Sequence, residues 1–159
     1  MVSDGAGARL LHAACRFEGR SVPLLRAVLA AAPAMAMVRD DRGRTPLHVL
    51  ITESPRAHLA AAALAAACPD ALLAQDAGGY TPLARACRAI ARPASAPGAP
   101  GASPGDCLET VLALIRAEPA ALRQPDPQGR LPAHILARHH GASLDALRLV
   151  IWQHPPAAA

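Results

Sequence analysis

Apolar residues along much of the chain recur every three to four positions, the spacing that places side chains on one face of an α-helix. The clearest example predicts a helix from Ser21 to about Ala31, with an apolar face made by Val22, Leu25, Val28 and Leu29. The same spacing recurs over residues 111–115 and 144–151. No segment reads as a run of alternating strands, so the pattern predicts an all-α protein.

Several helix starts are marked by a polar residue just before the apolar positions. Thr45 and Pro46 suit the N-cap and the first helical position, because Thr accepts a bond from an unpaired N–H and Pro gives up an N–H that has no partner there. By the same rule, a second helix starts at Glu53-Ser54-Pro55. This helix is expected to run to about Ala67 and to stop at Cys68-Pro69. Asp106-Cys107-Leu108-Glu109 matches a capping box, and Ser143 is expected to cap the last helix.

An internal repeat organises these helices. An Asp stands three residues before a Gly four times, and the glycines Gly7, Gly43, Gly79 and Gly129 are separated by 36, 36 and 50 residues. A Pro lies ten residues before each of the last three glycines. The long third interval contains a 14-residue insertion, and its removal restores the 36-residue period. We therefore expect about four units, at residues 4–39, 40–75, 76–125 and 126–155, in one domain that spans residues 1–159.

The insertion has a distinct composition. Residues 93–105 read PASAPGAPGASPG and contain only Pro, Ala, Ser and Gly. Such a segment cannot bury a core of side chains, so we expect a disordered loop. The stretches that join the units each end in Asp-x-x-Gly. Asp favours the first position of a turn and Gly the position where the chain leaves it, so Asp40, Asp76 and Asp126 are interpreted as structural turn residues.

With these residues in view, the chain resembles the ankyrin repeat. The resemblance rests on Gly43-Arg-Thr-Pro-Leu-His48 and Gly79-Tyr-Thr-Pro-Leu-Ala84, each preceded by Asp-x-x, with degraded copies at Gly129 and Gly7. The period of 36 and the Pro-containing junctions depart from the family pattern. The resemblance implies a helix-turn-helix solenoid whose loops project as fingers at one edge. It also implies a concave groove that binds proteins, usually without catalysis.

In a stack of this kind, residues beside the turns and at the ends of the first helices face the partner. On this sequence the predicted protein-binding residues are Arg39, Asp41, Arg42, Arg44, Gln75, Tyr80, Arg88, Gln128, Arg130 and Arg138. Tyr80 is the favoured member, because aromatic residues with a polar tip are enriched in contact sites. The alternative is that these arginines form only a solvated face. An arginine-lined groove would prefer an acidic or carboxylate-bearing protein or peptide.

Composition narrows the picture further. Apolar residues make up 52% of the chain, but Phe17, Tyr80 and Trp152 are its only aromatic residues, so the core must consist of aliphatic side chains. The net charge is +4, and all 16 basic residues are Arg. This charge permits acidic partners without demanding nucleic acid. The start of the chain does not resemble a signal peptide and no apolar run could span a bilayer, which favours an intracellular protein, cytoplasmic or nuclear.

The cysteines and histidines fit structural positions better than chemical ones. Cys15 and Cys87 share the repeat position of Ile51 and Ala137, which predicts apolar core, while Cys107 after its cap gives a weak indication of a reactive thiol. His12, His48 and His134 share one repeat position, as expected for bonds between neighbouring turns. Neither group has metal-ligand spacing, so no metal and no cofactor are expected.

These features favour a binding protein over other classes. No catalytic motif is present and the serines before helices serve as caps, so no enzyme is expected. Nucleic-acid binding is disfavoured, because the basic residues are scattered and three aromatic residues cannot form a stacking platform. We therefore expect a protein-binding scaffold or adaptor with no small-molecule substrate and no membrane association. The alternatives are a regulatory or substrate-targeting subunit of a larger assembly, or a structural module that self-associates through its repeat ends.

Overall fold

The structure is a computed structural model, and it describes residues 11–15, 22–53, 58–90, 104–138 and 148. Within these ranges the regular elements are helices and no strand occurs, so the fold is all-α, as predicted. Residues 11–15 are helical. The α-helices that follow are α2 (Val22–Ala31), α3 (Pro46–Glu53), α4 (His58–Ala67), α5 (Pro82–Ile90), α6 (Pro104–Ala117) and α7 (Pro132–Ala137).

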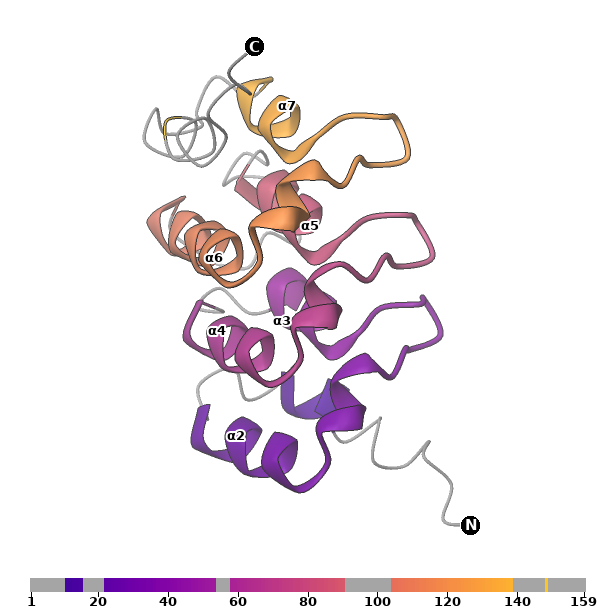
Figure 1. The fold of residues 1–159 in the computed structure, drawn as a ribbon, viewed down its shortest axis with the longest axis vertical. Coiled ribbons are helices and arrows are strands. Elements are labelled where there is room, and N and C mark those ends of the chain that lie inside the picture. Colours follow the sequence, from indigo (N-terminus) through magenta and orange to yellow (C-terminus); the bar gives the residue numbers. More distant parts are fainter. Residues whose placement is uncertain (1–10, 16–21, 54–57, 91–103, 139–147, 149–159) are drawn as a thin grey trace.

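The helices lie in two rows (Figure 1). In the inner row α5 packs between α3 and α7, and in the outer row α4 packs between α2 and α6. The rows also contact each other, α3 against α4 and α5 against α6. The loops that precede α3, α5 and α7 project on the side away from the outer row (Figure 1). We call them finger one (residues 39–44), finger two (residues 75–80) and finger three (residues 125–130).

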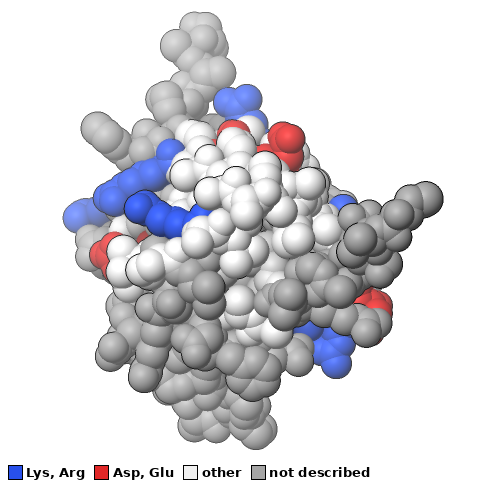
Figure 2. All heavy atoms as spheres, turned by 90° about the horizontal axis from the view of Figure 1, so that it is seen from below, with Lys and Arg blue, Asp and Glu red and all other residues white. Residues whose placement is uncertain are grey.

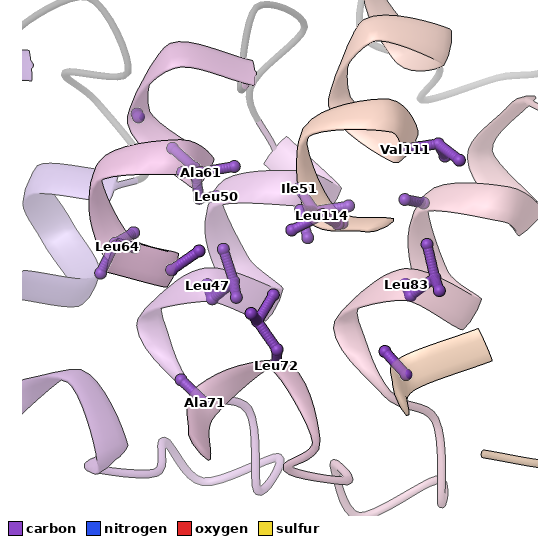
Figure 3. Close-up of a cluster of buried hydrophobic side chains, with 14 of the residues drawn as sticks. Leu47, Leu50, Ile51, Ala61, Leu64, Ala71, Leu72, Leu83, Val111 and Leu114 are labelled. Carbon is purple, nitrogen blue, oxygen red and sulfur yellow. The ribbon is translucent and has the colours of Figure 1, made fainter. Parts of the chain in front are cut away.

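One apolar core runs through both rows. It extends without a break from Leu11 to Leu136, and its largest side chains are leucines such as Leu47, Leu50 and Leu64. Figure 3 shows side chains from both rows meeting there, with Leu50 of α3 and Ala61 of α4 side by side. Alanines fill much of the remaining core, and small side chains let neighbouring helices approach closely. The core is aliphatic, as the scarcity of aromatic residues predicts.

A short 3₁₀ helix follows each outer-row helix, and the sequence reasoning did not anticipate it. The three are η1 (Pro33–Met37), η2 (Pro69–Leu72) and η3 (Pro119–Arg123). The residue before each Pro is extended, with φ near −150°. Pro disfavours helical geometry in the residue before it but suits the first helical position itself, so it ends one helix and starts the next. The predicted stop at Cys68-Pro69 is confirmed.

The start of α6 corrects two predictions. The helix begins at Pro104, so Asp106 lies inside it and is not an N-cap. Residues 104 and 105, predicted to belong to the disordered loop, are helical, because Pro is well suited to open a helix. The rest of the loop, residues 93–103, lies outside the described residues, as do the predicted caps at Ser54 and Ser143.

Thr45 also behaves differently from the prediction. The Nε2 atom of His48 lies 2.9 Å from the carbonyl oxygen of Tyr80, which can only accept a hydrogen bond, so Nε2 carries the proton and Nδ1 accepts. The Thr45 hydroxyl, 2.9 Å from Nδ1, therefore donates to His48 instead of accepting from the backbone. In the next unit the hydroxyl of Thr81 does accept from the N–H of Ala84, at 3.3 Å.

Candidate protein-binding surface

The three fingers share one turn. In finger one the Gly43 N–H donates to the Asp40 carbonyl over 2.8 Å, and the Asp40 carboxylate accepts the N–H groups of Arg42 and Arg44. Asp76 and Asp126 make the equivalent bonds in the other fingers. Gly43, Gly79 and Gly129 each have φ between +67° and +75°, a region that costs other residues strain. The prediction that these aspartates are structural turn residues is confirmed.

Tyr80 of finger two is at the centre of a polar cluster. Its ring is half-buried, and the guanidinium carbons of Arg85 and Arg88 both lie 4.8 Å from the ring centroid. A guanidinium over an aromatic face is stabilised by about 0.5–1 kcal/mol when the site is exposed. The Tyr80 hydroxyl donates to Oε1 of Gln128 in finger three, at 3.3 Å. The ring is therefore fixed between α5 and the neighbouring finger.

Gln128 connects this ring to a further arginine. Its Oε1 atom also accepts from Nη2 of Arg130 at 2.7 Å, and Arg130 donates to the buried carboxylate of Asp126. Predicted residues Tyr80, Arg88, Gln128 and Arg130 thus come together across two units that are far apart in sequence. We call these four residues, with Arg85, the Tyr80 surface.

Arg85 was missed by the sequence reasoning. Its Nε atom donates to Oδ2 of Asp76 over 2.7 Å, and the Asp76 side chain is fully buried. Burial alone would raise the pKa of Asp76, but the hydrogen bond from the Tyr80 backbone and the Arg85 guanidinium outweigh it and hold the pKa below its usual value. One signal was present in the sequence: the position after the finger glycine is Arg44 and Arg130 elsewhere but Tyr80 here, so Asp76 needed a cation from another position.

Arg44 is a correction to the predicted binding set. It is 7% exposed, and its guanidinium pairs with Asp40 at 2.8 Å and with Glu53 of α3 at 3.3 Å. A side chain so engaged and buried is part of the fold and not of an open surface. Arg39 is exposed, but its Nη1 atom donates to the carbonyl oxygens of Gly43 and Gln75, so it also ties finger one to finger two.

The other members of the predicted set lie on the surface. A further group of the predicted residues is exposed: Asp41, Arg42, Gln75, Arg88 and Arg138. Asp41, Arg42 and Gln75 are at the tips and sides of the first two fingers. Among the described residues, none of these three side chains bonds to the Tyr80 surface. The predicted set therefore divides into a connected cluster around Tyr80 and a looser group on fingers one and two.

The repeated histidines connect adjacent units. Nε2 of His12 lies 2.9 Å from the Arg44 carbonyl, as Nε2 of His48 does from that of Tyr80. Burial lowers the pKa of His48, which keeps the ring neutral. Both contacts confirm the expectation of bonds between neighbouring turns. His134 instead accepts the Leu131 N–H within its own unit, at 3.1 Å.

The cysteines are consistent with structural positions. Cys15 and Cys87 are fully buried, and burial raises the pKa of each thiol to about 12, so neither is a ready nucleophile. Ala137, at the same repeat position, is exposed, so the predicted core position is wrong in that unit. Cys107 lies within α6 and not just after its cap, which removes the argument for a reactive thiol there.

The view from the α2 end shows arginine and acidic side chains near the edge of the described surface, with uncharged residues between them (Figure 2). Among the described residues, no group of three or more His, Cys, Asp or Glu could hold a metal ion. Of the helices described, none is both long enough and apolar enough to cross a bilayer. No protein-family model matches the chain, and no curated protein matches it.

Proposed function

We propose that this chain is a protein-binding scaffold, an ankyrin-type solenoid of about four helix-turn-helix units that has no chemistry of its own. Support for the solenoid comes from the two rows of helices and from three fingers that repeat one turn with one glycine conformation. A single helix pair of this kind cannot cover its own apolar face, and stacking the units buries a continuous core.

The observation that carries the binding function is the Tyr80 surface. It brings an aromatic ring and three guanidinium groups together from two units, and the ring is held in place before any partner arrives. Tyr and Arg are the residue types that dominate binding energy at protein interfaces. A side chain that is already ordered loses less entropy on binding, which favours affinity. The partner proposed is a protein or peptide that lies across fingers two and three.

The alternative of a module that self-associates through its ends places its contacts elsewhere. It would use the end of the stack, whereas the Tyr80 surface lies between units. A regulatory or targeting subunit would use the same surface and differs only in what the partner does. The position of the Tyr80 surface therefore supports binding between units over self-association through the ends, and it supports a scaffold and a regulatory subunit equally.

The test is affinity capture from native lysate with a matched pair of variants. Tyr80→Ala with Arg42→Glu changes the Tyr80 surface and the exposed tip of finger one, while Arg26→Glu changes an exposed arginine of α2 in the outer row. Arg44 is left intact because its loss would disturb the fold. Proteins recovered with the native chain and with Arg26→Glu should be absent with the double variant. Equal recovery with all three chains would contradict the proposed function at this surface.

A further inference from the structure

Arg88 and Arg138 occupy the same place in neighbouring units. Each lies nine residues after the positive-φ glycine of its finger, Gly79 or Gly129, and their helices α5 and α7 pack against each other in the inner row. Packed helices lie about 8–10 Å apart, so the two side chains leave the inner row with roughly that separation. Both residues are exposed.

Arg88 and Arg138 differ from the neighbouring arginines because their guanidinium groups are not paired with a carboxylate of the described residues. Arg44, Arg85 and Arg130 are each paired with the aspartate of a finger. Within the described part of the chain, Arg88 contacts the Tyr80 ring and Arg138 makes no side-chain bond, and neither forms an ion pair with an acidic residue. The inner row therefore presents two uncompensated guanidinium groups, and that of Arg88 lies over an ordered aromatic ring.

Resting on the proposed function, we propose that the partner is an extended acidic segment in which two carboxylates stand three residues apart and pair with Arg88 and Arg138. A polyproline II segment brings every third side chain to the same side and advances about 9 Å over three residues, which matches the separation of the two helices. Guanidinium groups bind carboxylates through paired, charge-assisted hydrogen bonds. The end of the segment that pairs with Arg88 then lies beside the Tyr80 ring, which Arg88 contacts.

A nucleic acid fits this surface less well. Proteins that bind nucleic acids without sequence preference use several stacking rings along a continuous basic path, and Tyr80 is the one Phe, Tyr or Trp among the described residues. Three nearby arginines are already neutralised by aspartates. Isolated carboxylates need only the two inner-row arginines that have no ion pair among the described residues, Arg88 and Arg138.

A random library of 12-residue peptides displayed on phage tests the proposal with the full chain. Selection on the native protein should enrich peptides with Asp or Glu at positions i and i+3. One selected peptide, made synthetically and labelled, is then titrated against Arg88→Gln/Arg138→Gln and against the control Arg26→Gln/Arg116→Gln. The control removes two exposed arginines from the outer row. Affinity should fall at least tenfold with the inner-row pair and stay within twofold with the control.

The other outcomes separate the two proposals. Enriched peptides without the acidic pair, or equal loss in both double variants, would overturn the inference and leave the binding function standing. Failure to enrich any peptide would count against both. A 12-nucleotide oligothymidine that binds more tightly than the selected peptide, with an affinity that falls steeply with salt, would assign the arginines to nucleic acid instead. Circular dichroism of each variant shows that the fold is retained.

Discussion

Fingers one and two have the same turn but obtain the cation for their aspartate from different places. In finger one Arg44, directly after the glycine, folds back onto Asp40 at 2.8 Å and is buried. In finger two that position is Tyr80, and the cation is Arg85 from helix α5, bound to Asp76 at 2.7 Å. Finger three returns to the first arrangement with Arg130 and Asp126. The turn requires a neutralised carboxylate but does not fix the source of the charge.

The difference has a consequence for function. Once α5 supplies the cation, the position after the glycine is released from its structural role and can present a ring. The same helix places Arg85 and Arg88 at 4.8 Å from that ring. In finger one Arg44 is buried in its ion pairs, so only the exposed residues at the tip are left to contact a partner. The comparison explains why a binding surface is proposed at finger two and not at finger one.

The largest expected effect is the loss of the finger-two carboxylate. Asp76→Ala removes the acceptor for the N–H groups of Gly78 and Tyr80 and for Arg85, and the side chain it removes is fully buried. The free energy of unfolding should fall by about 3 kcal/mol. Asp41→Ala, at the exposed tip of finger one, is the control and should change it by less than about 0.5 kcal/mol. Urea denaturation measures both, and similar costs would contradict the structural role of Asp76.

The finger glycines give a graded series. Gly129→Ala should lower the free energy of unfolding by about 1–2 kcal/mol, because its φ is positive. No clash adds to this backbone strain, since nothing lies within 4 Å of the added Cβ. Gly43→Ala should cost about 1 kcal/mol more, because its Cβ would lie 2.7 Å from the Ala77 nitrogen and would displace the bond from that N–H to the Arg42 carbonyl. Chemical denaturation of both variants checks the difference. If Gly43→Ala were no more costly than Gly129→Ala, the fingers would not be in contact as described.

A charge transplant tests the comparison itself. Arg85→Ala should destabilise the protein by about 1.5 kcal/mol, because Asp76 loses a charge-assisted hydrogen bond. Adding Tyr80→Arg to the Arg85→Ala variant gives finger two the arrangement of finger one. This second substitution should restore about 1 kcal/mol of the free energy of unfolding. Tyr80→Arg in the presence of Arg85 should give little or no gain. A double-mutant cycle by urea denaturation measures the coupling, and additive effects would mean that the two cation sources are not interchangeable.

The smallest effect concerns pH. Burial lowers the pKa of His48 in the folded chain. Below about pH 6.5, the ordinary pKa of histidine, the unfolded chain therefore binds more protons at this residue than the folded chain does. The stability that depends on neutral His48 is present above pH 6.5 and declines as the pH falls from there toward the folded pKa. Thermal denaturation between pH 7.5 and 5 should show this decline in the native chain and a smaller one in His48→Gln. An equal pH dependence in both would show that His48 does not cause it.

The sequence predicted what depends on local chemistry. The Asp-x-x-Gly turns, the all-α class, a helix over Val22–Ala31 and the stop at Cys68-Pro69 all follow from neighbouring residues, and the structure agrees. The predicted start at Ser21 lies outside the described residues. The sequence did not predict the 3₁₀ helices, because a Pro is compatible both with the end of one helix and with the start of another. The burial of Arg44 and the role of Arg85 depend on contacts nine residues apart, which no local rule supplies. The choice of Tyr80 from the sequence was a matter of residue type, and its surroundings became visible only in three dimensions.

The central claim is that a partner lies on the Tyr80 surface, and mapping by nuclear magnetic resonance tests it most directly. Backbone amide shifts of the labelled chain are followed as a selected acidic peptide is added. The account predicts that the largest changes lie at Tyr80, Arg88, Gln128 and their neighbours in α5 and α7. Changes concentrated on the outer-row helices α2, α4 and α6, or no changes at saturating peptide, would contradict it.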